Sequence, residues 1–267
     1  MLKGKLIGFG TRSEVFEWGE DDALKLSREE TYPLKQEFSN TEAAYRAGLP
    51  VPEPKELLRI EGRDAIVFER IHHKTTLWAQ LTDEVPWMFI ERARAFAELH
   101  VRIHNSRMDG LPRQREFLGE HIQRALISPS QKETILRVLN KLPEGMSPCH
   151  FDFHPDNILV CPDDYIIVDW PLANCGNPLA DVARTIVLIQ QGSLSAYNSR
   201  PWIADQEFRA WFLHFYLTRY LELRPGSQTE LKWWEGIIAA ARLAENIRHE
   251  QSLLLQRVEA TVARTDT

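Results

Sequence analysis

The chain has 267 residues, and 43% of them are hydrophobic, so it can bury a sizeable core as one large domain or two smaller ones. Its 32 basic and 38 acidic side chains give a formal net charge of −6, and no basic run is dense enough to follow a nucleic-acid backbone. Composition therefore excludes a disordered chain and argues against nucleic acid as a partner.

The cysteines and the apolar segments indicate the cellular compartment. Cys149, Cys161 and Cys175 form no closely spaced pair, and the first residues lack the apolar core of a signal peptide. The longest apolar segments are interrupted by charges before they reach the length of a membrane span. We expect a reduced, cytoplasmic protein that does not associate with a membrane.

The N-terminal third has the pattern of a small β-sheet with one main helix. Residues 5–26 alternate in polarity and contain turn residues, which predicts three short strands. Residues 33–48 have a helical pattern that stops at Gly48, because two prolines follow closely. Two further strands are predicted at 55–60 and 64–69.

The rest of the chain is predicted to be mainly helical. From residue 87 apolar side chains recur at spacings of three and four, and two long segments, 204–223 and 229–262, keep that spacing on either side of a Pro-Gly pair. We therefore expect an α+β protein with two lobes and a cleft between them. The predicted boundary separates an N-terminal lobe, 1–71, from a helical lobe, 72–267.

The most informative motif lies in the helical lobe. Residues 150–160 read His-Phe-Asp-Phe-His-Pro-Asp-Asn-Ile-Leu-Val, and an apolar triplet that ends in Asp169 follows closely. The triplet predicts a buried strand that delivers Asp169 to the edge of a site, while Asp152 and Asn157 share a turn. Phosphoryl transfer needs a carboxylate to orient the attacking hydroxyl and oxygen ligands for Mg²⁺. These three residues supply both.

Phosphate-binding residues are also predicted in the N-terminal lobe. Gly8 and Gly10 lie between the first two predicted strands, where glycine lets the backbone approach a triphosphate, and Ser13 stands where a third glycine is expected. Lys25, in the third predicted strand, follows at a distance that suits contact with the α- and β-phosphates. Each feature also has a plain structural interpretation, as turn chemistry and as an edge lysine.

Lys25 needs an anionic partner, and the following helix offers Glu37 and Glu42. The spacing back from residues 49–52 favours Glu37. The segment 66–71 is expected to cross between the lobes, where backbone groups, including those of Glu69 and Ile71, can hydrogen-bond the edge of an adenine. Its plain structural interpretation is a strand and its exit.

Taken together, these motifs resemble the aminoglycoside phosphotransferase family of kinase-like small-molecule phosphotransferases. The resemblance covers nearly the whole chain and is most specific in the H-x-D-x-x-x-x-N motif and the I-x-D-W pattern after it. The segments that carry it are 7–10, 23–25, 48–52, 68–71, 99–104, 150–159, 167–170 and 176–184.

The resemblance implies a protein-kinase-like fold, ATP and Mg²⁺ as cofactors, and a hydroxyl group of a small molecule, an aminoglycoside or another small alcohol, as acceptor. It assigns Asp152 as catalytic base and Asn157 and Asp169 as magnesium ligands. It also pairs Lys25 with Glu37 on the phosphates and has Asp181 brace the catalytic loop. A protein substrate is not expected, because Trp170-Pro171 follows Asp169 in place of the Phe-Gly of protein kinases.

Two alternatives remain open at this level. Phe151 stands where the family most often has glycine, which together with Ser13 leaves room for a module that binds nucleotide without transferring phosphate. The pair His100 and His104, at i and i+4, is compatible with zinc and so with a metal-dependent hydrolase, although packing explains such a pair more simply. The acceptor also stays open. Residues of the last helices that could form its pocket are Trp233, Trp234, Glu235, Glu245, His249 and Glu250.

Overall fold

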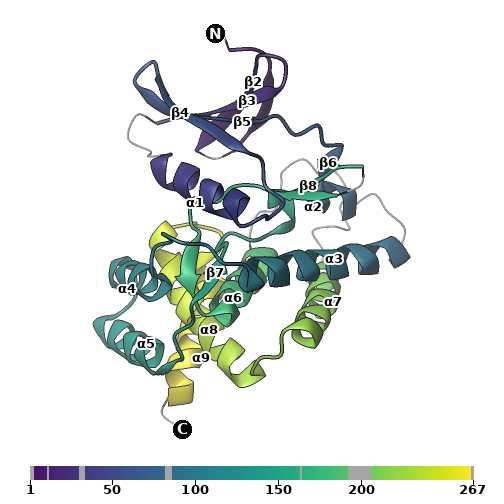
Figure 1. The fold of residues 1–267 in the computed structure, drawn as a ribbon. Helices are drawn as coiled ribbons and strands as arrows, with labels where there is room; N and C mark the ends of the chain where they lie inside the picture. Colours follow the sequence, from purple (N-terminus) through teal and green to yellow (C-terminus); the bar gives the residue numbers. More distant parts are fainter. Residues whose placement is uncertain are drawn as a thin grey trace.

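The computed structural model describes residues 3–10, 12–29, 34–81, 86–162, 164–191 and 206–265. A β-sheet lies at the N-terminal end of the molecule, and a larger group of helices lies below it (Figure 1). This arrangement confirms the predicted α+β fold, with a small sheet and one helix in one lobe and mainly helices in the other.

The N-terminal sheet has five antiparallel strands in the order β1-β2-β3-β5-β4. Alternation along β3 places Leu24 and Leu26 in a small buried cluster, so Lys25 points to the opposite face. Lys25 pairs with Val15 on β2 and with Ile66 on β5, in the middle of the sheet. The strands are β1 (Leu6–Phe9), β2 (Ser13–Trp18), β3 (Asp22–Ser27), β4 (Pro54–Ile60) and β5 (Arg63–Glu69).

Helix α1 (Lys35–Arg46) is the one helix among the described residues of this lobe, and it ends before Gly48, whose φ of 71° only glycine adopts freely. Both features match the prediction. After β5 the chain forms β6 (Thr75–Thr76), which pairs with the second lobe's β8 (Ile158–Val160). The proposed boundary at residues 71 and 72 remains a prediction.

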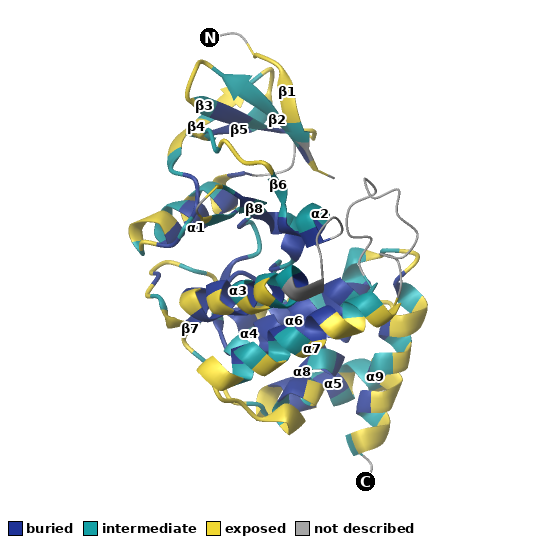
Figure 2. Cartoon of the chain, turned by 90° about the vertical axis from the view of Figure 1, so that its right-hand side faces the viewer, coloured by how far each residue is buried: buried dark blue, intermediate teal, exposed yellow. Residues whose placement is uncertain are grey.

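The second lobe is built around α6 (Pro178–Gln191), which is buried continuously from Leu179 to Ile189. Helices α7 and α8 pack against it, and Figure 2 shows buried residues concentrated where these helices meet. None of the described helices is long and apolar enough to cross a bilayer. The other described helices after β5 are α2 (Leu77–Leu81), α3 (Pro86–Asn105), α4 (Gln114–Arg124), α5 (Pro129–Lys141), α7 (Gln206–Leu223), α8 (Gln228–Arg242) and α9 (Gln251–Thr265).

Two small sheets carry the segments around the central motif. Strand β7 (Ser147–Cys149) pairs with β10 (Asn174–Gly176), and β8 pairs with β9 (Tyr165–Ile167) as well as with β6. A single 3-10 turn, η1 (Pro155–Asn157), lies between Asp152 and β8. The predicted turn and the predicted strand before Asp169 are therefore both present.

The continuous helical segment predicted for 229–262 is wrong, because the chain turns between α8 and α9. Helix α8 ends at Arg242 and is followed by η3 (Leu243–Glu245) and by Asn246, which has a left-handed backbone with φ 55°. Asparagine tolerates this conformation better than most residues. The turn is held by Arg242, whose guanidinium binds Glu245 and Glu250 on either side of it.

The contact between α8 and α9 makes Gly236 a position where alanine should be harmful. A methyl group there would lie 1.9 Å from Thr261 Oγ1, whereas at Gly119 in α4 nothing lies within 4 Å. We expect Gly236→Ala to lower the free energy of unfolding by about 1–3 kcal/mol through overpacking. Gly119→Ala, the matched control, should raise it by about 0.5–1 kcal/mol through helix propensity. Urea unfolding of both variants measures this, and equal effects would contradict it.

Candidate active site

The two lobes meet at the side chain of Lys25. Its Nζ donates to Glu37 Oε1 at 2.5 Å and to Asp169 Oδ1 at 2.7 Å, which joins β3, α1 and the segment after β9. Although burial disfavours the charged ammonium, the two carboxylates raise the pKa of Lys25 above its usual value. Glu37 is therefore its helical partner, as predicted, and Glu42 instead binds Arg46.

One cation between two carboxylates leaves an excess negative charge, and the pKa of Glu37 shows its effect. Its side chain is 2% exposed, while that of Asp169 is 38% exposed. Burial raises the pKa of the Glu37 carboxyl to about 7, against the opposing attraction of the Lys25 ammonium. Asp169 thus keeps the more accessible carboxylate, which is the one able to bind an added cation.

His150 connects the two halves of the central motif. Burial lowers its pKa, so the ring is neutral, and its Nε2 lies 3.1 Å from the carbonyl oxygen of Val168. A neutral ring that donates from Nε2 must accept at Nδ1, and the Asp152 N–H donates there at 3.2 Å. This single ring therefore fixes the backbone of Asp152 relative to the residue before Asp169.

Asn157 completes the group of oxygen-bearing side chains. Its Nδ2 donates to the main-chain oxygen of Asp152 at 2.9 Å, which orients the amide and leaves its Oδ1 as a possible ligand. Its own carbonyl accepts from the Val168 N–H at 3.0 Å. The structure therefore links Asp152, Asn157 and the chain that leads to Asp169 by direct hydrogen bonds.

One face of α6 holds the loop around Asp152. The Asp181 carboxylate accepts from the N–H groups of His150 and Phe151 at 2.7 and 3.0 Å. Arg184 Nε donates to the carbonyl of Phe151, and Thr185 donates to that of Phe153 at 2.8 Å. These three helix residues, at i, i+3 and i+4, are all buried, and they hydrogen-bond the backbone on both sides of Asp152.

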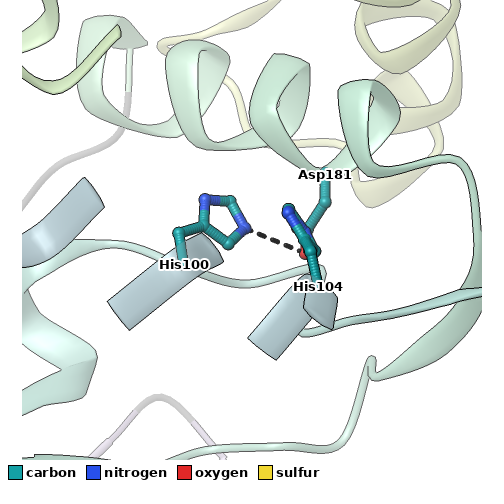
Figure 3. A group of neighbouring side chains, drawn as sticks. All are labelled: His100, His104 and Asp181. Carbon is teal, nitrogen blue, oxygen red and sulfur yellow. Dashed lines mark hydrogen bonds and ion pairs between the residues drawn. The ribbon is translucent and has the colours of Figure 1, made fainter. Parts of the chain in front are cut away.

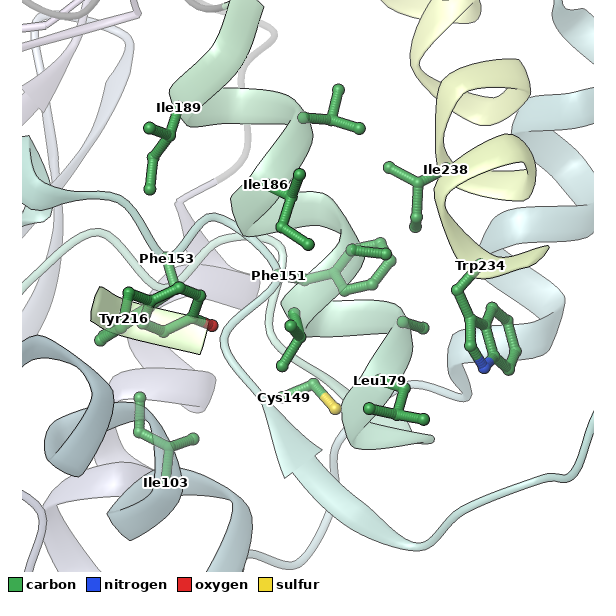
Figure 4. Close-up of a cluster of buried hydrophobic side chains, with 14 of the residues drawn as sticks. Ile103, Cys149, Phe151, Phe153, Leu179, Ile186, Ile189, Tyr216, Trp234 and Ile238 are labelled. Atoms are coloured by element: carbon green, nitrogen blue, oxygen red, sulfur yellow. The ribbon is translucent and has the colours of Figure 1, made fainter. Parts of the chain in front are cut away.

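Phe151 occupies a strained backbone position within this loop. Its φ is 64°, which is rare for a bulky residue and costs about 1–3 kcal/mol. The ring is fully buried among apolar side chains of the helical lobe, against the guanidinium of Arg184 at 5.3 Å (Figure 4). The ring thus lies in the core, and its burial offsets the strain.

Asp181 is itself supported by two histidines of α3 (Figure 3). His100 Nε2 and His104 Nε2 lie 3.1 and 3.2 Å from its Oδ2, and their Nδ1 atoms each lie 2.7 Å from a tyrosine hydroxyl, of Tyr216 and Tyr220. Both Nδ1 atoms and the Nε2 of His104 therefore have hydrogen-bond partners, whereas the Nε2 of His100 faces the same carboxylate oxygen without a hydrogen bond of its own. This favours the packing interpretation of the pair over a zinc site, because a catalytic zinc needs an open coordination position.

The glycine hairpin lies beside the strand of Lys25. Gly8 pairs with Val15, and the Gly10 N–H donates to the carbonyl of Ser13 at 2.8 Å, which closes the turn between β1 and β2. Ser13 is buried. Ser13 lies on β2, next to β3, Gly8 lies on the outer strand β1, and Gly10 lies in the turn between them. The contact of these three residues with phosphates remains a prediction.

The predicted adenine-binding segment, 66–71, comprises the end of β5 and the two residues after it. Glu69 is exposed and pairs with Asp22 on β3, and the Ile71 carbonyl accepts from the His73 N–H at 3.1 Å. The crossing therefore runs beside the strand that carries Lys25. Whether its backbone binds a base remains a prediction.

Sequence reasoning missed Arg184 and Thr185. Asp181 came from the resemblance, and residues at i+3 and i+4 on the same helix share its face, so a helical pattern over 178–191 could have indicated both. The Nη2 of Arg184 lies 3.9 Å from Asp152 Oδ1 and 2.9 Å from Glu245 Oε1. Nothing in the sequence signals that second contact, because it joins α6 to η3.

Comparison with known proteins agrees with this geometry. The family model described as "Phosphotransferase enzyme family" matches residues 5–233. The chain belongs to this family, which confirms the expected resemblance and the enzyme class, a small-molecule kinase. No curated protein matches the sequence.

Solved structures share the fold at low sequence identity. A thermostable mutant of aminoglycoside phosphotransferase APH(4)-Ia, in a ternary complex with AMP-PNP and hygromycin B, has a TM-score of 0.67 at 19% identity over 97% of this chain and 92% of its own. A choline/ethanolamine kinase family protein from Mesorhizobium loti has 0.61 at 16%, over 98% and 88%. Amicoumacin kinase hAmiN, in complex with AMP-PNP, Ca²⁺ and Ami, has 0.64 at 13%, over 98% and 88%.

The buried histidine network predicts how stability depends on pH. Burial lowers the pKa of His104 to about 3, from 6.5 in the unfolded chain, so the folded protein binds one proton fewer between these values. The contribution is complete above pH 6.5 and is lost as pH falls toward 3. Between pH 6 and 4, His104→Gln should reduce the slope of unfolding free energy by up to about 1.4 kcal/mol per pH unit. Denaturant unfolding at several pH values measures this. His72→Gln, at an exposed position, should keep the wild-type slope.

Proposed function

We propose that the protein transfers the γ-phosphate of ATP to a hydroxyl group of a small molecule. The observation that carries this proposal is the bridge from Lys25 to Glu37 and Asp169, because it places the predicted phosphate-binding cation at the predicted metal ligand. The interpretation of Lys25 as an edge lysine does not apply, because β3 is the central strand of the sheet. Two structural neighbours, the one bound to hygromycin B and the amicoumacin kinase, are consistent with a small-molecule acceptor.

In this proposal each side chain has a positional or electrostatic role. Lys25 leaves Asp169 to bind the α- and β-phosphates while Glu37 keeps hold of it, and the hairpin of Gly8 and Gly10 covers the triphosphate. Backbone groups from Glu69 to Ile71 bind the adenine edge. Asp152 orients the acceptor hydroxyl and takes its proton as the new O–P bond forms and the bond to ADP breaks.

The donor set fits a magnesium ion. Asp169 presents a partly exposed carboxylate, and the amide of Asn157 is oriented so that its oxygen, and not its nitrogen, is available. Carboxylate and amide oxygens are ligands that Mg²⁺ prefers. When bound, the ion would neutralise charge on the phosphates.

The alternative of a nucleotide-binding module without transfer activity has lost its main support. It depended on Phe151 changing the conformation of the loop. The ring instead lies in the core, and residues of α6 hydrogen-bond both the N–H and the carbonyl of Phe151. The side chain of Asp152 stays 22% exposed. We therefore prefer an active kinase.

Asp152→Ala tests the role of the base. We expect phosphate transfer, measured as kcat in an ATP-consumption assay over a panel of small alcohols, to fall by about 10²- to 10⁴-fold. Nucleotide affinity should stay near the wild-type value, because Asp152 does not bind the phosphates. Asp164→Asn, at an exposed loop position, is the control. Transfer at the wild-type rate by Asp152→Ala would remove this residue from the mechanism.

A second experiment tests the phosphate-binding cation. Lys25→Ala should lower kcat/KM for ATP by about 10- to 100-fold, since one hydrogen bond to a charged group is lost. Glu37→Gln should have a smaller effect in the same direction, and Glu42→Gln on the exposed side of α1 should have none. Steady-state kinetics with varied ATP measures all three. Identical values for Lys25→Ala and wild type would exclude the phosphate role.

A further inference from the structure

The carboxylates near Asp152 are joined to arginines in a chain of ion pairs. Glu245 Oε1 binds Arg184 Nη2 and its Oε2 binds Arg242 Nη1, both at 2.9 Å. Glu250 binds the same Arg242 through both oxygens, at 2.5 and 2.7 Å. The signs therefore alternate along the chain from Asp152 through Arg184, Glu245 and Arg242 to Glu250.

Glu245 is the member of this chain that an acceptor can reach. Arg184 is 2% exposed and Arg242 6%, whereas Glu245 is 24% exposed, close to the 22% of Asp152. Both carboxylates face the same Arg184 nitrogen, at 3.9 and 2.9 Å. A molecule that places a hydroxyl on Asp152 therefore has Glu245 beside it.

This geometry decides what kind of molecule fits. Two buried guanidiniums compensate Glu245 and Glu250, so the only negative charge left in the chain of ion pairs is that of Asp152 itself. Asp152 is therefore the one uncompensated carboxylate of this chain of ion pairs, and a polycation, which needs several carboxylates, finds no second one there.

The third acidic candidate from the last helices is also paired. Glu235 binds Arg257, which in turn contacts Gln190.

A carboxylate that accepts one N–H on each oxygen still has lone pairs for further donors. Glu245 can therefore accept a hydrogen bond from a neutral hydroxyl while it offers no net charge to an ammonium group.

We propose that the acceptor is an uncharged polyhydroxy molecule and not a polycation, with Glu245 binding one hydroxyl while Asp152 orients another. This inference rests on the proposed function, whose base is Asp152. It narrows the acceptor to neutral sugars and related polyols.

The test uses the full chain saturated with Mg²⁺ and AMP-PNP, and kanamycin as the polycationic probe in calorimetric titration. Wild type should not bind kanamycin more tightly than about 1 mM, and should not phosphorylate it when ATP replaces AMP-PNP. Arg242→Gln leaves Glu245 and Glu250 undercompensated, so it should bind kanamycin at least about tenfold more tightly than Arg242→Lys, which keeps the charge. Adding Glu245→Gln to Arg242→Gln should reverse much of that gain.

Each result decides the inference. Micromolar binding or phosphorylation of kanamycin by the wild type would overturn it, and phosphorylation would at the same time support the proposed function, so the two fail on different observations. Equal affinities of Arg242→Gln and Arg242→Lys would also overturn it. Thermal melting shows whether the variants fold, and if Arg242→Gln does not, the wild-type titration alone decides.

Discussion

The arrangement of the site depends on one buried cation shared by two carboxylates. Lys25 brings together β3, helix α1 and the segment after β9, and no other described side chain joins all three by ion pairs. A buried ammonium without partners would lose its proton or stay in water, so these contacts also fix how the sheet sits above the helices. The residue that is proposed to bind phosphates thus also joins the two lobes, together with the hydrogen bonds from the Ile167 N–H to the carbonyl of Pro50 and from Asn40 to the carbonyl of Trp170.

The second constraint is the set of hydrogen bonds from α6 to the loop around Asp152. Asp181, Arg184 and Thr185 bind the backbone around Asp152, and His100 and His104 support Asp181 from α3. Because these hydrogen bonds include both backbone groups of the strained Phe151, the loop keeps a conformation that an isolated segment would avoid. Arg184 also forms an ion pair with Glu245. The loop that positions the base is therefore linked directly to the residue proposed to bind the acceptor.

Local patterns explain which parts were predictable. The strands around Lys25 and the end of α1 before Gly48 follow from alternation and turn residues, and the predicted pairing with Glu37 followed from its spacing back from residues 49–52. The segment 229–262 failed because its apolar spacing continues through a turn that has no glycine or proline. What ends α8 there is a set of ion pairs around Arg242, and such contacts leave no periodic signal.

By itself the sequence determined the two-lobed α+β architecture, the family, and the residue types able to carry out phosphoryl transfer, because helical and strand periodicity and short motifs are local properties of a chain. Only the tertiary structure decided that Lys25 reaches Asp169, that the Phe151 ring lies in the core, and that Glu245 is neutralised by Arg184 and Arg242. These contacts join residues far apart in the sequence, and their energies depend on burial and distance, which spacing along a chain does not specify.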